Sequence, residues 1–157
     1  MIHPATTLAD YEHVRALLRA YGAENQMTPS ANARYFEDLA ALPGRYTPPD
    51  GALFLAVDAS GPVGCAGLTP VPGLPGAAEL KRVYVLPGAR RNGHARALSE
   101  VVIAEARALG YSQVVLSTRP RWPAAMTLYT RLGFSEIMPF KQRPEEMPDL
   151  LFLGLSL

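Results

Sequence analysis

The spacing of apolar residues changes along this chain, and the change constrains the fold more than any other feature of the sequence. Near the start the apolar residues recur at helical intervals, and further on they alternate as they do in strands. Two helices are therefore predicted first: one from Thr7 or Asp10 to about Tyr21, ended by Gly22, and one from about Ser30 to Pro43-Gly44. Because strands follow these helices, the chain is not an all-helical protein.

The remainder of the chain alternates between strands and helices. Strands are predicted at Ala52–Val57, Val63–Leu68, Ala78–Val85, Gln113–Thr118, Phe134–Met138 and Leu150–Leu157, with helices at Gly93–Leu109 and Pro123–Leu132. Gly110 and Gly133 follow these helices, and glycine is the usual residue at a helix C-terminus. Since three neighbouring strands precede the strand–helix connections, the sequence predicts an α/β (α+β) fold with a mixed sheet.

Length and composition limit the classes of protein that fit. The length of 157 residues suits a single domain, residues 1–157, with a sizeable core. A net charge of +1 is too small to suggest nucleic acid or a membrane surface, and no apolar run approaches the roughly 20 residues of a membrane helix. With one cysteine, no signal-peptide pattern and no cluster with metal-ligand spacing, we expect a cytoplasmic protein without a metal.

One segment predicts a binding site for an anion. The turn Arg90-Arg91-Asn92-Gly93-His94-Ala95 follows a strand and opens the long helix. The first amides of a helix have no internal partner and lie at the positive end of its dipole, so they hold a phosphate well. Gly93 allows the backbone to approach an oxygen, and Arg90, Arg91 and Arg96 would add charge-assisted bonds. A structural turn with solvated arginines is the alternative interpretation.

Two motifs in the second half of the chain carry a family resemblance. Arg90, Gly93 and Ala95 match Arg/Gln-x-x-Gly-x-Gly/Ala, and Ala125–Phe134 reads Ala-Met-Thr-Leu-Tyr-Thr-Arg-Leu-Gly-Phe. Together, with a helix and a strand between them, they resemble the motifs of the GNAT superfamily of N-acetyltransferases, from roughly Ala52 to the C-terminus. Trp122 departs from the pattern, since many relatives have asparagine there, and this puts one coenzyme contact in question.

The resemblance implies a fold and a co-substrate. The fold would be a mixed, mostly antiparallel sheet of about six to seven strands flanked by about four helices, with a splayed central strand pair. The co-substrate would be acetyl-CoA, with its pyrophosphate on the turn and its pantetheine arm paired to the central strand. The residues that would bind it are Val83, Tyr84, Val85, Arg90, Arg91, Asn92, Gly93, His94, Ala95 and Arg96.

The resemblance also implies acetyl transfer to a primary amine by direct attack in a ternary complex. An amine is mostly protonated at neutral pH, so a base must take its proton. Glu79 is the candidate base and would act directly or through a water. The alternative is that Glu79 only forms an ion pair with Lys81. The alternation of side chains along a strand places Glu79 on the face opposite Arg82. Tyr129 is the candidate acid for the departing thiolate, unless it is a core tyrosine. Cys65 could serve a two-step route, but its apolar surroundings favour a small buried residue.

The sequence leaves alternatives for the activity, the acceptor and the oligomeric state. The chain could be a catalytically idle sensor that binds acetyl-CoA, although Glu79 and Tyr129 favour an enzyme. A dinucleotide-binding enzyme does not fit, because the turn lacks the first glycine of Gly-x-Gly-x-x-Gly. The acceptor could be a small molecule or a peptide amine, and Arg119 and Arg121 could meet an acceptor carboxylate or be solvated. Finally, the strand at 150–157 could pair across a homodimer.

Overall fold

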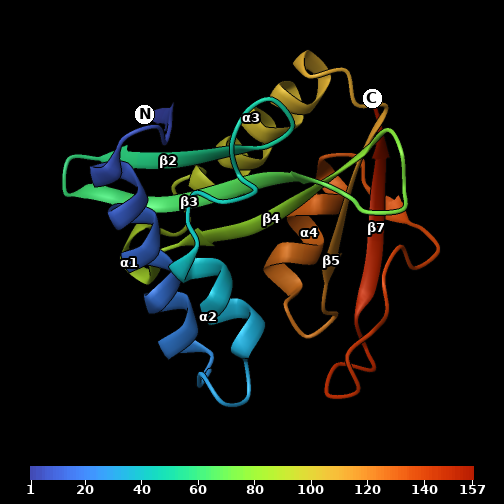
Figure 1. Ribbon diagram of the computed structural model, residues 1–157, viewed down its shortest axis with the longest axis horizontal. Helices are drawn as coiled ribbons and strands as arrows, with labels where there is room; N and C mark the ends of the chain where they lie inside the picture. The colour runs from blue at the N-terminus through green and yellow to red at the C-terminus, as the bar shows by residue number, and fades with distance from the viewer.

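A seven-stranded sheet forms the centre of the computed structural model, which describes residues 1–157. The strands are β1 (Ile2–Pro4), β2 (Ala52–Asp58), β3 (Gly61–Pro70), β4 (Ala77–Val85), β5 (Gln113–Thr118), β6 (Ser135–Glu136) and β7 (Leu151–Ser156). The helices are α1 (Leu8–Glu24), α2 (Ala33–Ala40), α3 (His94–Ala108) and α4 (Pro123–Arg131), with a 3-10 turn, η1 (Pro87–Ala89), before α3. The sheet order is β1-β2-β3-β4-β5-β7-β6 (Figure 1), so the predicted mixed, mostly antiparallel sheet with four helices is confirmed.

Strands β4 and β5 form the parallel pair of the sheet, and they separate after a short contact. The ladder joins only Ala77, Ala78 and Glu79 to residues 113–115, although β4 continues to Val85. In Figure 1, β4 lies across the view while β5 and β7 stand upright, so the two halves of the sheet diverge. The predicted splay of the central strands is therefore present, and its apex lies at Glu79.

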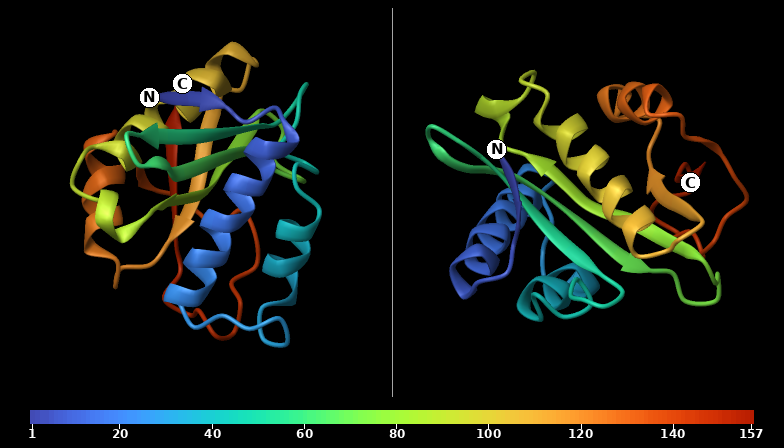
Figure 2. Two further views of the ribbon diagram at one scale, coloured as in Figure 1. Left: turned by 90° about the vertical axis from the view of Figure 1, so that its left-hand side faces the viewer. Right: turned by 90° about the horizontal axis from the view of Figure 1, so that it is seen from above.

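The helices form one layer on each side of the sheet. Helices α1 and α2 lie side by side on one face, and α3 and α4 lie on the other (Figure 2). A cluster of 12 buried residues fills the first interface, and a cluster of 18 fills the second. The larger cluster includes Leu98 and Val102 of α3, so the apolar stripe of this helix holds its first turn near the end of β4.

The first helix is capped as predicted but is longer than predicted. The Thr7 hydroxyl accepts a hydrogen bond from the Asp10 amide at 3.1 Å, and the Asp10 carboxylate accepts one from the Thr7 amide at 3.0 Å. The prediction that Gly22 ends the helix is wrong, because α1 runs on to Glu24. An interior glycine costs only about 1 kcal/mol, and Gly22 packs against the ring of Tyr35.

None of the four helices has the length and apolar character needed to cross a membrane.

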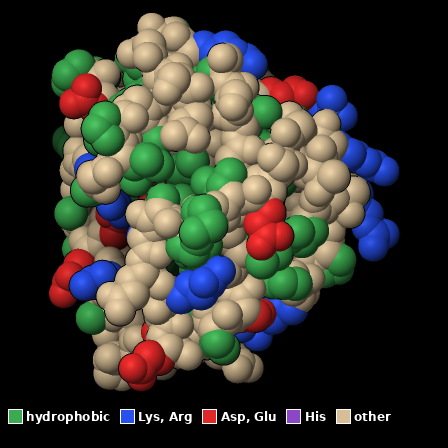
Figure 3. All heavy atoms as spheres, turned by 90° about the vertical axis from the view of Figure 1, so that its right-hand side faces the viewer, with side chains coloured by type: hydrophobic (Ala, Val, Ile, Leu, Met, Phe, Trp, Pro, Cys, Tyr) green, Lys and Arg blue, Asp and Glu red, His purple; other side chains and the backbone are tan.

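The edges of the sheet differ most from the sequence-based expectation. Strand β1 was not predicted, because three residues are too few to show an alternating pattern. Strand β6 covers two residues rather than 134–138, and it pairs with β7 only at Leu153 and Gly154. On the side of the molecule drawn in Figure 3, hydrophobic side chains gather near the centre, and Lys and Arg side chains lie both beside them and along the right-hand edge. Pairing of 150–157 across a homodimer stays a prediction.

Candidate active site

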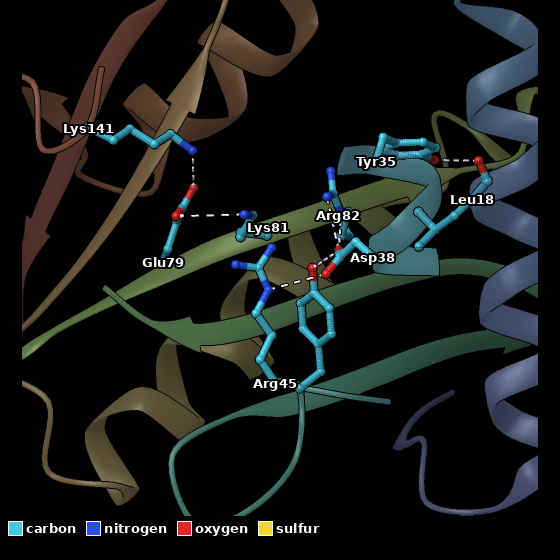
Figure 4. Close-up of polar contacts among 9 residues, drawn as sticks. Leu18, Tyr35, Asp38, Arg45, Glu79, Lys81, Arg82 and Lys141 are labelled. Atoms are coloured by element: carbon cyan, nitrogen blue, oxygen red, sulfur yellow. Dashed lines mark hydrogen bonds and ion pairs between the residues drawn. The ribbon is translucent and has the colours of Figure 1, made fainter. Parts of the chain in front are cut away.

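Glu79 lies at the apex of the split between β4 and β5, where two lysines contact it (Figure 4). Its side chain is 9% exposed; Oε2 accepts a hydrogen bond from Lys141 Nζ at 2.9 Å, and Oε1 lies 4.0 Å from Lys81 Nζ. Pairing with Lys81 was foreseen as an alternative, whereas Lys141, from the segment between β6 and β7, was missed. Burial lowers the pKa of Lys81 to about 8, and the Glu79 carboxylate opposes this shift.

A bulge bends β4 directly after Lys81. Arg82 and Val83 both lie opposite Ala66 of β3, and Arg82 has a φ of 59°, in the left-handed region. The extra residue breaks the strict alternation of side chains, so Arg82 turns toward α2, on the same face as Glu79. The prediction that Arg82 lies on the opposite face is wrong for this reason. No sequence signal such as a glycine marks the bulge.

The Arg82 guanidinium belongs to a network centred on Asp38 of α2 (Figure 4). The Asp38 carboxylate accepts hydrogen bonds from the Tyr46 hydroxyl at 2.6 Å and from Arg82 Nε and Nη2 at 3.1 and 3.0 Å. Arg45 Nε lies 3.3 Å from the same carboxylate. Burial acts to raise the pKa of Asp38, but the bond from Tyr46 and the charges of Arg82 and Arg45 outweigh it, so the pKa is lowered. The network fixes α2 over the bulge.

The turn before α3 has the geometry expected of an anion site. Arg91 and Gly93 have φ values of 66° and 79°, and α3 begins at His94 with no side chain capping its first amides. Those amides are therefore available to an external acceptor. A Cβ added to Gly93 would meet no atom within 4 Å, so the space above the turn is open. Asn92 Nδ2 donates to the Ala89 carbonyl at 3.3 Å and steadies the turn.

Arg90 has a different role from the other arginines of the turn. Its Nε donates to the Val85 carbonyl at 2.9 Å, and its Nη2 donates to Glu24 Oε2 at 2.8 Å. The Tyr84 hydroxyl donates to the same Glu24 oxygen at 2.8 Å. Arg90 therefore ties the end of β4 and the last turn of α1 to the anion turn. Glu24 was missed from the sequence, because its contacts depend on the unpredicted extra turn of α1.

A hollow of about 210 Å³ lies between α3 and α4, next to the turn. Its lining combines two arginines with small and apolar side chains, namely Arg96, Ala124, Thr127, Leu128, Arg131 and Leu132. Arg96 Nε also pairs with Glu100 at 2.8 Å. With the turn on one side and two cations in its wall, the hollow suits a further part of an extended anionic ligand.

Tyr129 of α4 is buried, as a core tyrosine would be, with 8% exposure and an edge-to-face contact to Phe134 at 5.7 Å between centroids. Burial raises its pKa to about 12, and Tyr21 of α1 adds to the rise. With so high a pKa the hydroxyl keeps its proton at neutral pH and can act as a donor.

Cys65 and Arg119 are both engaged within the fold. Cys65 is fully buried, its thiol donates to the Arg82 carbonyl at 3.4 Å, and burial raises its pKa to about 12. The expectation of a small buried residue is confirmed. Arg119 Nη2 lies 2.9 Å from Asp149 Oδ1, and its guanidinium lies 5.9 Å from the centroid of the Trp122 ring. Arg119 is therefore paired rather than solvated.

Comparison with known proteins gives the class of this chain. An uncharacterized N-acetyltransferase of Schizosaccharomyces pombe is 33% identical over 122 residues, which are 77% of this chain and 73% of that protein. One from Escherichia coli is 29% identical over 133 residues, 83% and 80% of the two chains. A structure of a GNAT-family acetyltransferase from Staphylococcus aureus has the same fold, with a TM-score of 0.79 at 20% identity and 99% coverage of both chains. Both relatives matched by sequence are named as N-acetyltransferases, which places this chain in the class of acyltransferases.

The family follows from a wider match. The sequence model of the Acetyltransferase (GNAT) family matches residues 13–134, which is more than half of the chain. The chain belongs to this family.

Proposed function

We propose that the chain transfers the acetyl group of acetyl-CoA to a primary amine of a small molecule or a peptide. The observation that carries the proposal is the split between β4 and β5, with the carboxylate of Glu79 at its apex and the open turn at Gly93 following the other end of β4. The apex suits the reacting thioester and the turn suits the pyrophosphate of the same extended molecule. Acetyl-CoA would supply an activated acetyl group.

The coenzyme side of the site would be built mainly from backbone. The amides from Arg91 to Arg96 would hold the pyrophosphate, helped by the side chains of Arg91 and Arg96. Backbone groups of Val83 and Tyr84, beyond the point where β4 leaves β5, would pair with the pantetheine arm as an added strand would. Arg90 would act indirectly, because its bonds to Val85 and Glu24 hold the turn in place.

The chemistry on the acceptor side would start at Glu79. Glu79 would take the proton of the incoming ammonium, directly or through a water, and the nitrogen lone pair would then attack the thioester carbonyl carbon. A backbone N–H near Val83 would stabilise the charge that grows on the carbonyl oxygen. The carbon–sulfur bond breaks, and the products are an N-acetyl amine and coenzyme A.

Tyr129 would complete the reaction by donating a hydrogen bond or a proton to the departing thiolate. Its pKa of about 12 keeps the hydroxyl protonated at any pH where the enzyme would work. Direct attack is favoured over a route through an acetylated cysteine, because the Cys65 thiol is buried and its pKa is also about 12.

The proposal is tested by following free thiol released from acetyl-CoA with a panel of primary amines. Binding of acetyl-CoA without turnover on any amine would instead favour a sensor. The coenzyme site is tested by calorimetry with Gly93→Glu, which places bulk and negative charge over the turn and should abolish binding. Gly93→Ala is the matched control: both variants strain the left-handed φ by about 1 to 2 kcal/mol, but alanine brings no charge. Unchanged affinity in folded Gly93→Glu would refute the site.

A further inference from the structure

The chain contains two lysines among its 15 basic residues, and both contact Glu79. Lys81 comes from β4 and Lys141 from the segment between β6 and β7, and Figure 4 shows them approaching the carboxylate from two sides. Their side chains are 15% and 39% exposed, respectively. An ammonium is a compact charge with three rotatable donors, so it can exchange one carboxylate for another without the fixed fork geometry of arginine.

Positive charge exceeds negative charge around Lys81. Arg82, Arg45 and Lys141 all act on it as cations, and Glu79 is the carboxylate that offsets them. Asp38 balances part of the charge, since it pairs with both arginines. Four cations therefore share two carboxylates; Lys81 and Arg82 are largely shielded from water, whereas Lys141 and Arg45 lie at the more exposed side of the cluster. Such a surplus is unfavourable unless an anion joins it, so the cluster suits an anionic group of a ligand.

A buried hydroxyl beside Glu79 is a second, independent observation. Thr69 of β3 pairs directly with Glu79 of β4, so the two side chains lie on the same face of the sheet. Thr69 is 1% exposed, and its Oγ1 is buried without a hydrogen-bond partner in the protein. Buried hydroxyl groups are normally paired. A polar ligand that displaces the side chains covering this oxygen would give it a partner.

We infer that the acceptor is an amino acid, whose carboxylate binds Lys81 and Lys141 and whose amine is delivered to Glu79. The inference rests on the proposed acetyl transfer. When the acceptor binds, its carboxylate becomes the partner of Lys81 and Lys141. Its ammonium takes the position beside Glu79 that a lysine ammonium occupies in the free protein. Glu79 is thereby released from its ion pairs and takes the ammonium proton. Because Lys141 Nζ lies only 2.9 Å from Glu79, the amine and carboxylate of the acceptor must lie close together, as they do in an α-amino acid.

Arg119, one of the two cations that the sequence suggested for this purpose together with Arg121, suits the carboxylate less well. Asp149 already lies 2.9 Å from the Arg119 guanidinium, so the charge of Arg119 is largely balanced.

With an amino acid as the acceptor, the products of the reaction are an N-acetyl amino acid and free coenzyme A.

The experiment compares kcat/KM for a set of amino acids with kcat/KM for their primary amides, measured as thiol release from acetyl-CoA. Each pair keeps the amine and the side chain and differs in the carboxylate. We expect the wild type to prefer the acid by about 10- to 100-fold, the value of a charge-assisted hydrogen bond. In Lys141→Met this ratio should fall toward one, mainly through KM for the acid, and Lys141→Arg should restore part of it. Arg107→Met removes an exposed charge from the end of α3 and should leave the ratio unchanged.

The outcomes separate this inference from the proposed function. If amides or simple amines are acetylated as fast as amino acids, acetyl transfer stands and the carboxylate site is refuted. If the acid preference persists in Lys141→Met, the lysines are not the site. If no amine of any kind is acetylated, the proposed function fails, and this inference fails with it.

Discussion

Asp38→Asn should destabilise the protein, because Asp38 balances the Arg82 guanidinium. The Asp38 side chain is 14% exposed and that of Arg82 is 20% exposed, so the pair is largely shielded from water. Removing one partner of a buried pair typically costs 3 to 5 kcal/mol, and the retained amide oxygen can still accept from Tyr46. We therefore expect a loss of about 3 kcal/mol, or a fall in Tm of about 6 to 12 °C.

The effect should depend on pH in a defined direction. The pKa of Asp38 is lowered in the fold, so its stabilisation is complete above the unfolded value of about 3.9 and is lost as pH falls through the lower folded value. Urea unfolding should show the full difference from wild type at pH 7 and a smaller one below about pH 4. Glu37→Gln, an exposed neighbour on α2, is the control and should change stability by no more than about 0.5 kcal/mol. Equal losses in the two variants would refute the assigned role of Asp38.

Three further variants test the chemistry. Glu79→Gln should lower turnover by roughly 100- to 10,000-fold with little change in acetyl-CoA affinity. The loss of turnover should become smaller as pH rises, because more of the amine is then unprotonated. An equal loss at every pH would indicate that Glu79 only positions the substrate. Tyr129→Phe keeps the ring contact with Phe134, so melting should be near native while turnover falls about 10- to 1,000-fold; a wild-type rate would remove Tyr129 from the mechanism. Cys65→Ala should cost about 1 kcal/mol and retain most turnover, and an acetylated Cys65 detected by mass spectrometry would overturn direct attack.

Regular elements were predictable because their signals are local. Strand Gln113–Thr118 has the predicted bounds, since β-branched residues and flanking turns are read directly from the sequence. The turn ending in Gly93 was also predictable, because a left-handed residue before a helix favours glycine. Features that depend on packing were not: Gly22 stays helical and lies against Tyr35, and Arg82 adopts a left-handed conformation although its sequence neighbours suggest a regular strand.

The candidate site was predictable only in part, for the same reason. Glu79 and Tyr129 lie on a strand and a helix that can be recognised from neighbouring residues in the sequence. Lys141 reaches Glu79 from 62 positions away in the sequence, and Glu24 reaches Arg90 from 66. Ion pairs between such distant residues leave no periodic or spacing signal in a single sequence. They follow from the arrangement of the elements around the split.

A crystal structure of the complex with coenzyme A would test the central claim most directly. We expect the sulfur in the split between β4 and β5, near Glu79 and the Tyr129 hydroxyl, with the pyrophosphate on the amides that follow Gly93. The pantetheine arm should run along β4 from Val83. A coenzyme whose pyrophosphate binds elsewhere, or whose sulfur lies away from Glu79, would contradict the proposed acetyl-CoA site.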